Sequence, residues 1–416
     1  MISVDEALVI VLDTARPLGV ERVALLDSLS RVLAQEIRSP RDVPGFDNSA
    51  MDGYAVRAAD ISNASESHPV RLAITETVAA GKMPEREVKP GQAARTMTGA
   101  PIAPGADAIV PVERTRESGD SVEILASAEG NAFVRPRGED LKLGEVAMTP
   151  GKLLGPADLG MLASLNRAMV GVYRRPRVAV VATGDELVDI DEVPSGAQVV
   201  NSSAYALAAA VREAGGEAAI LRVARDTPAE VRERLAEASA FDVVLTTGGV
   251  SVGQFDHVKT VLDELGMKTL FHGVAQKPGR PLKFGTLRER PVFGLPGNPV
   301  STLVCFYLYA RPALLKMTGR QEVGLPRLNV RCASDIKLAK GLTEFVRVRL
   351  ERRDGQYFAA PTGNQGSGIF SSIARAGGLL IGPAELNLLR AGDQATVLLL
   401  AGLADEPFLE RRLQRN

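Results

Sequence analysis

The stretch FDVVLTTGGVSVGQFDHV, residues 241–258, has the pattern that decides the fold of the middle of this chain. Residues 242–246 are mostly apolar and β-branched, which predicts a short buried strand. Gly248, Gly249 and Gly253 follow, and a helix is expected to begin at Asp256. A glycine-rich loop between a strand and a helix directs backbone N–H groups at an anion. Glycines at such a place can also serve a tight connection that binds nothing.

The carboxylate of Asp256 favours a ligand over a simple connection. A carboxylate beside a bound phosphate is repelled unless a cation lies between the two groups. The loop therefore predicts a phosphate-bearing ligand together with Mg²⁺.

Composition indicates an ordinary globular protein. The 416 residues are 45% hydrophobic and 24% charged, and this length corresponds to roughly two to four domains. Lys and Arg total 49 against 50 for Asp and Glu, and Trp is absent, so neither a basic footprint nor stacking platforms for nucleic acid are expected. There is no apolar run of about 18 residues. We expect a cytoplasmic protein without a membrane partner, whose two cysteines are reduced.

The first third of the chain predicts a helical segment interrupted by a β-rich domain. Residues 3–6 have the spacing of a capping box that opens a helix, and a second helix is expected over 25–34. Residues 44–60 form an irregular polar loop. Short alternating runs from 70 to 151 predict strands, and a helix is expected over 156–165. We assign 1–50 with 146–176 to a discontinuous N-terminal domain and 51–145 to the β-rich domain.

Strands alternate with helices over 177–327, which predicts a doubly wound α/β domain whose strands run parallel. Thr227 followed by Pro228 indicates a helix start, and a long helix is expected from Pro299. Short strands return over 328–416, where we expect a small β-barrel or sandwich. The fold class is thus multidomain α/β.

Polar residues follow the strands of the α/β domain where each strand ends. In an open α/β sheet, ligands bind outside the carboxyl ends of the strands. Glu186 follows the first strand, Asp226 the second and the glycine-rich loop the third, with later loops carrying Lys277 and Arg280. Carboxylates, glycine-rich turns and cations in one crevice suit positioning and charge stabilisation around a phosphate. The three histidines lack the spacing of metal ligands, which disfavours a zinc site. No Ser/His/Asp set is evident in the sequence, so nucleophilic catalysis is also disfavoured.

Several motifs together resemble one family, molybdopterin molybdenumtransferase (MoeA), which is also seen in the C-terminal part of gephyrin. The motifs are PGFDNSAMDGYAV (44–56), MTGAPIAPGADAIVPVE (97–113), RPRGEDLKLGE (135–145), ATGDEL (182–187), TTGGVSVGQFDHV (246–258), KPGRPL (277–282) and GLPGNPVS (294–301). They follow the family's order over nearly the whole chain. TGDEL with GGVS alone would fit any pterin-binding relative of the central domain.

The resemblance implies that adenylylated molybdopterin and molybdate react, with Mg²⁺, to give molybdenum cofactor and AMP. It also implies a homodimer of four-domain subunits whose cleft is shared between two subunits. A molybdopterin adenylyltransferase would supply the substrate, and molybdoenzyme maturation proteins would receive the product. The implied catalytic residues are Asp52, Thr98, Asp140, Glu186, Asp226 and Asp256, the metal ligands being Asp226, Asp256 and Glu186. The implied substrate-binding residues are Arg135, Gly248, Gly249, Ser251, Lys277, Arg280, Pro296, Pro299 and Ser367.

One position departs from the family pattern. Gly273 stands four residues before Lys277, where many members have a second lysine. Arg280 or Lys283 would have to compensate for the missing cation. The sequence also leaves open whether Glu186 holds the metal or instead positions the pterin or the molybdate.

Two other functions are compatible with parts of the chain. A pterin adenylyltransferase shares the central fold, but it needs only that domain, so the β-rich domain and the β tail disfavour it. A non-catalytic scaffold is possible on this architecture, as gephyrin shows, but the acidic residues of the crevice favour an enzyme.

Overall fold

The computed structural model describes residues 1–249 and 257–400 and divides the chain into two compact units. Unit 1 comprises Met1–Ala34, Gly151–Pro156 and the described part of Met169–Asn416, and unit 2 comprises Gln35–Pro150 and Ala157–Ala168. Ser251 and Asp256, both predicted site residues, lie outside the described residues. The finer division into four domains stays a prediction.

The core of unit 1 is a six-stranded sheet. Its strands lie in the order β16 (Glu217–Ile220), β13 (Arg177–Ala182), β17 (Val243–Thr247), β21 (Arg290–Leu295), β20 (Lys283–Leu287) and β18 (Lys268–His272). The first four are parallel, as predicted. Neighbouring residues of β13 face opposite cores, with Val178 and Val180 in one cluster and Ala179 and Val181 in the other. A strand buried on both faces explains the unbroken apolar run.

The expectation of parallel order is wrong for β20 and β18, which run antiparallel to their neighbours. The two residues between β20 and β21, Arg288 and Glu289, have φ values of 51° and 66°. Such a two-residue turn with both φ values positive joins antiparallel strands. Asn-Gly or Asp-Gly usually indicates this turn, and Arg-Glu does not, so the sequence pattern gave no signal for the hairpin.

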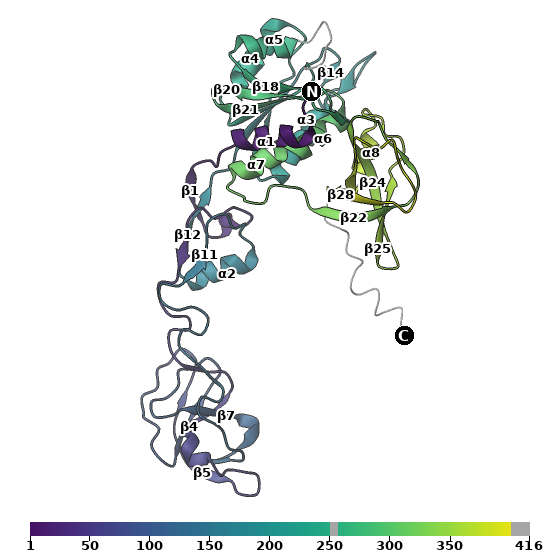
Figure 1. Ribbon diagram of the computed structural model, residues 1–416. Coiled ribbons are helices and arrows are strands. Elements are labelled where there is room, and N and C mark those ends of the chain that lie inside the picture. Colours follow the sequence, from purple (N-terminus) through teal and green to yellow (C-terminus); the bar gives the residue numbers. More distant parts are fainter. Residues whose placement is uncertain (250–256, 401–416) are drawn as a thin grey trace. The chain divides into compact units, whose positions relative to one another are not determined.

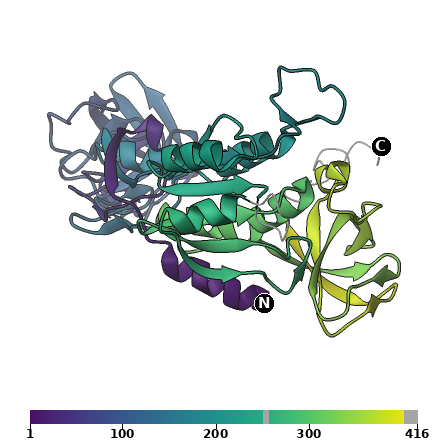
Figure 2. The same ribbon diagram turned by 90° about the horizontal axis from the view of Figure 1, so that it is seen from above.

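Helices cover both faces of this sheet (Figures 1 and 2). One face carries α1 (Val4–Thr14), α3 (Ser202–Glu213), α6 (Pro299–Cys305), the π-helical η4 (Phe306–Ala310) and α7 (Arg311–Met317). The other carries α4 (Pro228–Ala238) and α5 (His257–Glu264). The predicted caps are confirmed, since Ser3 forms a capping box with Glu6 and Thr227 accepts the N–H of Glu230. In the described chain α5 begins at His257.

The tail forms a closed five-stranded barrel, which confirms the predicted β-barrel. Its strands are β22 (Arg327–Cys332), β24 (Thr343–Arg353), β25 (Gln356–Pro361), β26 (Gly378–Gly382) and β28 (Gln394–Leu399). The ring closes because β24 pairs with both β25 and β26. A short strand, β19 (Gln276–Lys277), adds to β24 and links the barrel to the central domain. Smaller elements of unit 1 are α8 (Phe370–Ala374), β23 (Ile336–Lys337), β27 (Leu388–Leu389), β14 (Leu187–Val188) and β15 (Val199–Val200).

The helix expected over 25–34 is wrong. Only a 3₁₀ turn, η1 (Leu26–Ser28), forms there, after β1 (Val20–Ala24), which pairs with β12 (Met169–Tyr173). Val32 and Leu33 instead form bridges with Leu153 and Val172. Pairing with residues distant in sequence overrides the local helical spacing.

Unit 2 contains a second six-stranded sheet. Its order is β7 (Ala108–Pro111), β4 (Gly53–Val56), β6 (Gln92–Thr96), β5 (Val70–Val78), β9 (Ser121–Ile124) and β8 (Thr115–Ser118). Two short pairs join distant segments, β3 (Asn48–Ser49) with β10 (Val134–Arg135) and β2 (Ile37–Arg38) with β11 (Val146–Met148). The remaining elements are η2 (Ala58–Ile61), η3 (Val112–Arg114) and α2 (Pro156–Ser164), of which Pro156 belongs to unit 1. Within the described residues, no helix has the length and apolar character needed to span a membrane.

The contribution of α1 to the core gives a matched test. Val11 is fully buried and Val9 is 56% exposed on the same helix. Val11→Ala should lower the free energy of unfolding by about 1–2 kcal/mol, because the lost burial exceeds the gain in helix propensity. Val9→Ala should leave it unchanged or slightly raised. Thermal unfolding of both variants checks this, and an equal effect of the two would contradict the assigned face.

Candidate functional site

The carboxyl ends of four parallel strands lie side by side in unit 1. Backbone bonds connect the loops that leave them: the Gly184 N–H donates to Ala224 at 3.1 Å, and the Gly248 N–H to Leu295 at 3.2 Å. The loops after β16, β13, β17 and β21 therefore form one continuous edge. This is the edge at which α/β sheets bind ligands.

Acidic residues gather where β13 and β16 end. The Asp226 N–H donates to the Asp185 carboxylate at 3.1 Å. The Glu186 side chain folds back over Gly184, where an added Cβ would lie 2.5 Å from its carboxylate oxygen. The structure thus brings together Glu186 and Asp226, as predicted, and adds Asp185, which the sequence analysis did not single out.

The pKa of Asp226 is raised, and burial is the largest cause. Burial raises the pKa above its ordinary value, and the charges of Asp185 and Glu186 raise it further. A backbone N–H bond from Asp185 and the charge of His257 act in the opposite direction. A carboxylate held among other carboxylates is stabilised by a cation.

The glycine-rich loop begins beside the acidic group. Gly248 and Gly249 have φ values of 90° and 67°, and a Cβ on Gly249 would lie 2.3 Å from the Val258 side chain. A Cβ on Gly248 would lie 3.0 Å from the Thr183 carbonyl oxygen. Only glycine fits this backbone, which joins β17 closely to both α5 and the end of β13.

The carboxylates at this edge of the sheet fit a Mg²⁺ ion whose remaining ligands come from water and a bound phosphate. Among the residues described by the structure, no three His, Cys, Asp or Glu side chains form a metal-ligand cluster. Mg²⁺ commonly needs only one or two carboxylates, since water and phosphate oxygens complete its shell. Glu186 and Asp226 provide two carboxylates next to the loop.

The loop after β21 joins this edge to the barrel. The Asn298 amide donates to Ser367 Oγ at 3.0 Å, and the Val300 N–H donates to the Ser367 carbonyl at 3.1 Å. Pro296 and Pro299 flank Asn298, so three predicted residues are brought together here. Thr302 Oγ1 also donates to the Pro296 carbonyl at 2.5 Å.

A buried arginine that the sequence analysis missed holds the Ser367 loop. Arg347 is 1% exposed and donates to the Gly366 carbonyl and to Ser372 Oγ, both at 3.2 Å. Arg347 lies in the run FVRVRL, whose alternation suggests that its arginines face solvent. In the fold Arg347 does face away from the barrel interior, which Val346 and Val348 fill, but the segment 365–372 covers it and buries it.

The predicted cations have different surroundings. The Lys277 ammonium lies 3.0 Å from Glu344, whose side chain is nearly buried, and Arg280 Nε lies 3.1 Å from Met1 Sδ. Lys283 is buried and paired with Asp263 at 2.8 Å, so the suggestion that it compensates for Gly273 is wrong. Arg280 remains the candidate, because the Val274 N–H, next to Gly273, donates to its carbonyl at 2.9 Å. Gly273 has a φ of 87°, which disfavours lysine there.

Unit 2 carries a second polar group. One oxygen of Asp52 accepts both the backbone N–H and the hydroxyl of Thr98, each at 2.7 Å. These two bonds, the backbone one first, lower the pKa of Asp52 below its ordinary value. Two residues 46 positions apart in sequence are thus joined by hydrogen bonds, while their catalytic role stays a prediction.

The short strand β3 holds the other predicted residues of unit 2 near this group. Arg135 lies opposite Asn48 across the β3–β10 pair, while the Ser49 N–H donates to Ala100 in the loop after Thr98. Asp140 is tied to the segment preceding β3, since its N–H donates to the Val43 carbonyl at 3.0 Å. Arg135 and Asp140 are both exposed.

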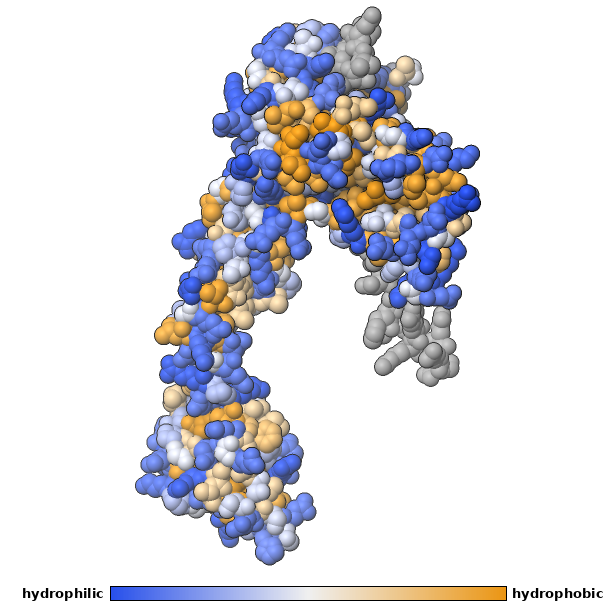
Figure 3. Space-filling model, in the orientation of Figure 1, coloured by the Kyte–Doolittle hydropathy of each residue, from blue (hydrophilic) through white to orange (hydrophobic). Residues whose placement is uncertain are grey.

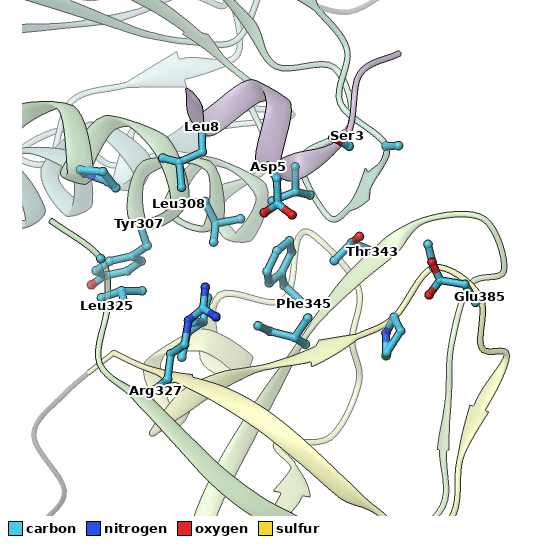
Figure 4. A pocket seen from close by; sticks show the side chains of 18 residues that line it. Ser3, Asp5, Leu8, Tyr307, Leu308, Leu325, Arg327, Thr343, Phe345 and Glu385 are labelled. Atoms are coloured by element: carbon cyan, nitrogen blue, oxygen red, sulfur yellow. The ribbon is translucent and has the colours of Figure 1, made fainter. Parts of the chain in front are cut away.

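Two hollows of unit 1 lie outside this edge or at its border. A polar hollow of about 490 Å³ borders the acidic group and is lined by Leu187, Asp189, Glu192, Arg222, Val223, Arg225, Glu230, Glu233 and Arg234. A larger one of about 550 Å³ lies where α1 and η4 meet the barrel, with Leu8, Tyr307 and Phe345 in its wall (Figure 4). Apolar residues, orange in Figure 3, gather on the face that carries α1. No predicted site residue lines the larger hollow.

Family models match most of the chain. "MoeA N-terminal region (domain I and II)" matches residues 2–166, "Probable molybdopterin binding domain" 179–316, and "MoeA C-terminal region (domain IV)" 329–400.

Curated relatives and a solved structure are similar over nearly the full length. A molybdopterin molybdenumtransferase of Nostoc sp. is 36% identical, covering 91% of this chain and 88% of the relative. One of Bacillus subtilis is 34% identical, covering 96% and 94%. The crystal structure of the "molybdopterin biosynthesis moea protein" from Pyrococcus horikosii has a TM-score of 0.85 at 33% identity, covering 97% of this chain and 100% of that one.

The acidic group makes a testable prediction about protonation. The pKa of Asp226, measured by NMR titration, should lie above 3.8 and should fall in Glu186→Gln, because one neighbouring charge is removed. Since the folded-state pKa is raised, stability should decrease as the pH rises through it, and Asp226→Asn should abolish that dependence.

Asp52 is the control of opposite sign, because its pKa is lowered and should rise in Thr98→Val. An Asp226 pKa unaffected by Glu186→Gln would contradict the described grouping.

Proposed function

Because the chain belongs to the molybdopterin molybdenumtransferase (MoeA) family, whose members are transferases of molybdenum cofactor biosynthesis, we propose that it inserts molybdate into adenylylated molybdopterin and releases AMP. The observation that carries this proposal is the grouping of Asp185, Glu186 and Asp226 beside the Gly248 loop. A crowded set of carboxylates next to a glycine-rich turn suits a Mg²⁺-bound phosphate.

The residues have distinct roles in this proposal. The Gly248 N–H is bonded to the Leu295 carbonyl, so the Gly249 N–H is the proposed phosphate donor of this turn. Glu186 and Asp226 would hold Mg²⁺, which neutralises phosphate charge when bound. Asp256 is the third proposed ligand. Arg280 and Lys277 attract molybdate, and Glu344 orients the Lys277 ammonium.

Unit 2 contributes acceptors and a cation to the same reaction. Asp52, kept ionised by its two bonds from Thr98, accepts hydrogen bonds from the substrate. Arg135 binds an anionic group, and Asp140 serves as a further acceptor. The two dithiolene sulfurs displace two oxo groups of molybdate, which leave as water, and one such water supplies the oxygen that AMP gains as the P–O bond of the anhydride breaks.

We further propose a homodimer that draws its substrate from a molybdopterin adenylyltransferase and passes its product to molybdoenzyme maturation proteins. Neither nucleic acid nor a membrane takes part. A cytoplasmic location is part of the proposal and agrees with Cys305 and Cys332, which are free and buried.

The activity has a direct test. Asp226→Ala should reduce molybdate-dependent AMP release by about 100-fold or more, because a charge-stabilising group is lost. Asp120→Ala, an exposed acidic position in unit 2, is the matched control and should retain full activity. Chromatography of released AMP provides the measurement, with melting temperatures as a folding check.

Full activity of the Asp226→Ala variant would refute its assigned role. If wild-type protein instead accumulates adenylylated pterin from ATP and molybdopterin, an adenylyltransferase is the correct function. If the wild-type protein releases no AMP at all in the presence of molybdate and Mg²⁺, a non-catalytic scaffold is the correct function.

Mixing two inactive variants tests the dimer. If Asp52 of one subunit and Asp226 of the other serve one reaction, co-refolded Asp52→Ala and Asp226→Ala chains should regain about a quarter of wild-type activity, the share expected for random pairing in a two-fold dimer. Each variant alone is the control. No recovery in demonstrably mixed dimers would show that both residues act within one chain.

A further inference from the structure

Phe133 has a backbone conformation that its side chain does not favour. Its φ is 55°, in the left-handed region, and the residue is 45% exposed. Asn131, two residues earlier, has a φ of 65°, but asparagine tolerates this region whereas a bulky aromatic residue does not. The strain at Phe133 is therefore not offset by burial of its ring.

The surrounding turn holds this conformation firmly. The Val134 N–H donates to the Asn131 carbonyl at 3.2 Å, and the Ile109 N–H donates to the Ala132 carbonyl at 2.9 Å. Ala132 and Val134 pack against two different hydrophobic clusters of unit 2. Because both neighbours are anchored, the Phe133 ring is presented outward at a defined place, as strained residues at functional sites are.

That place adjoins the polar group of unit 2. The Ala50 N–H donates to the Phe133 carbonyl at 2.9 Å, so Phe133 lies across from the segment that leads from β3 into Asp52. Met51, in that segment, is 37% exposed. Arg135, also exposed, follows two residues after Phe133. Phe133, Met51 and Arg135, all exposed, thus lie on two paired segments, one of which leads into Asp52.

We propose that the Phe133 ring is a stacking platform for a planar nitrogen heterocycle of the substrate, which makes it a positioning residue. The inference rests on the proposed function, whose substrate carries two such rings, pterin and adenine, together with phosphate. An aromatic face binds any such ring by stacking, while the nearby arginine suits the attached phosphate. Stacking affects substrate affinity and leaves the chemical step to other residues.

Three full-length variants test the role of the ring. Phe133→Asn removes the ring and relieves the backbone strain, so its melting temperature should be unchanged or higher. Phe133→Tyr keeps the ring. Met83→Asn is the matched control, since Met83 is a 69% exposed apolar residue elsewhere in unit 2. Binding of AMP is measured by calorimetry and binding of 6-hydroxymethylpterin by fluorescence titration, alongside KM and kcat for AMP release.

Phe133→Asn should weaken binding of one of the two probes, and raise KM, by about tenfold, the typical effect of removing one stacking ring, with kcat little changed. The weakened probe identifies the ring that stacks. Phe133→Tyr and Met83→Asn should behave as wild type.

Unchanged binding of both probes by Phe133→Asn would overturn the proposal, as would an equal loss in Phe133→Tyr. Absence of AMP release by wild-type protein would instead refute the proposed function, and the probe titrations would still decide the role of Phe133.

Discussion

The parallel register of β16, β13, β17 and β21 is the constraint on which the site of unit 1 depends. Because parallel strands end at one edge, it places loops from distant parts of the sequence in contact. The cost is visible at Asp226, whose pKa is raised by burial and by neighbouring carboxylates. A carboxylate in such surroundings is stabilised by a nearby cation, which is the physical basis of the proposed metal site.

Unit 2 also brings together polar residues that are distant in sequence, but it does so with short strands and loops. The two residues of β3 pair with β10 on one side, and Ser49 contacts the loop after Thr98 on the other. The buried strand β3 and its pairing with β10 thereby position Asp52, Thr98 and Arg135. The same pairing holds the strained turn at Phe133, so the polar and aromatic residues are carried by one hydrogen-bonded segment.

Much of the fold could be predicted because its signals are local. Capping residues at Ser3 and Thr227, the apolar run of β13 and the glycine-rich turn at Gly248 each depend on neighbours in sequence. The errors arose where distant contacts prevailed. Residues 25–34 pair with segments more than a hundred positions away, and an Arg-Glu turn reverses the chain before β21.

The sequence by itself determined the residue types of the site, the strand ends that carry Glu186 and Asp226, and the family. Such features follow from local patterns and motif order. Only the tertiary structure decided that Asp185 joins the acidic group, that Arg347 is buried beneath the Ser367 loop, and that Lys283 forms a buried ion pair with Asp263. Whether a charged side chain is buried, paired or available depends on contacts across the fold, and sequence spacing does not encode them.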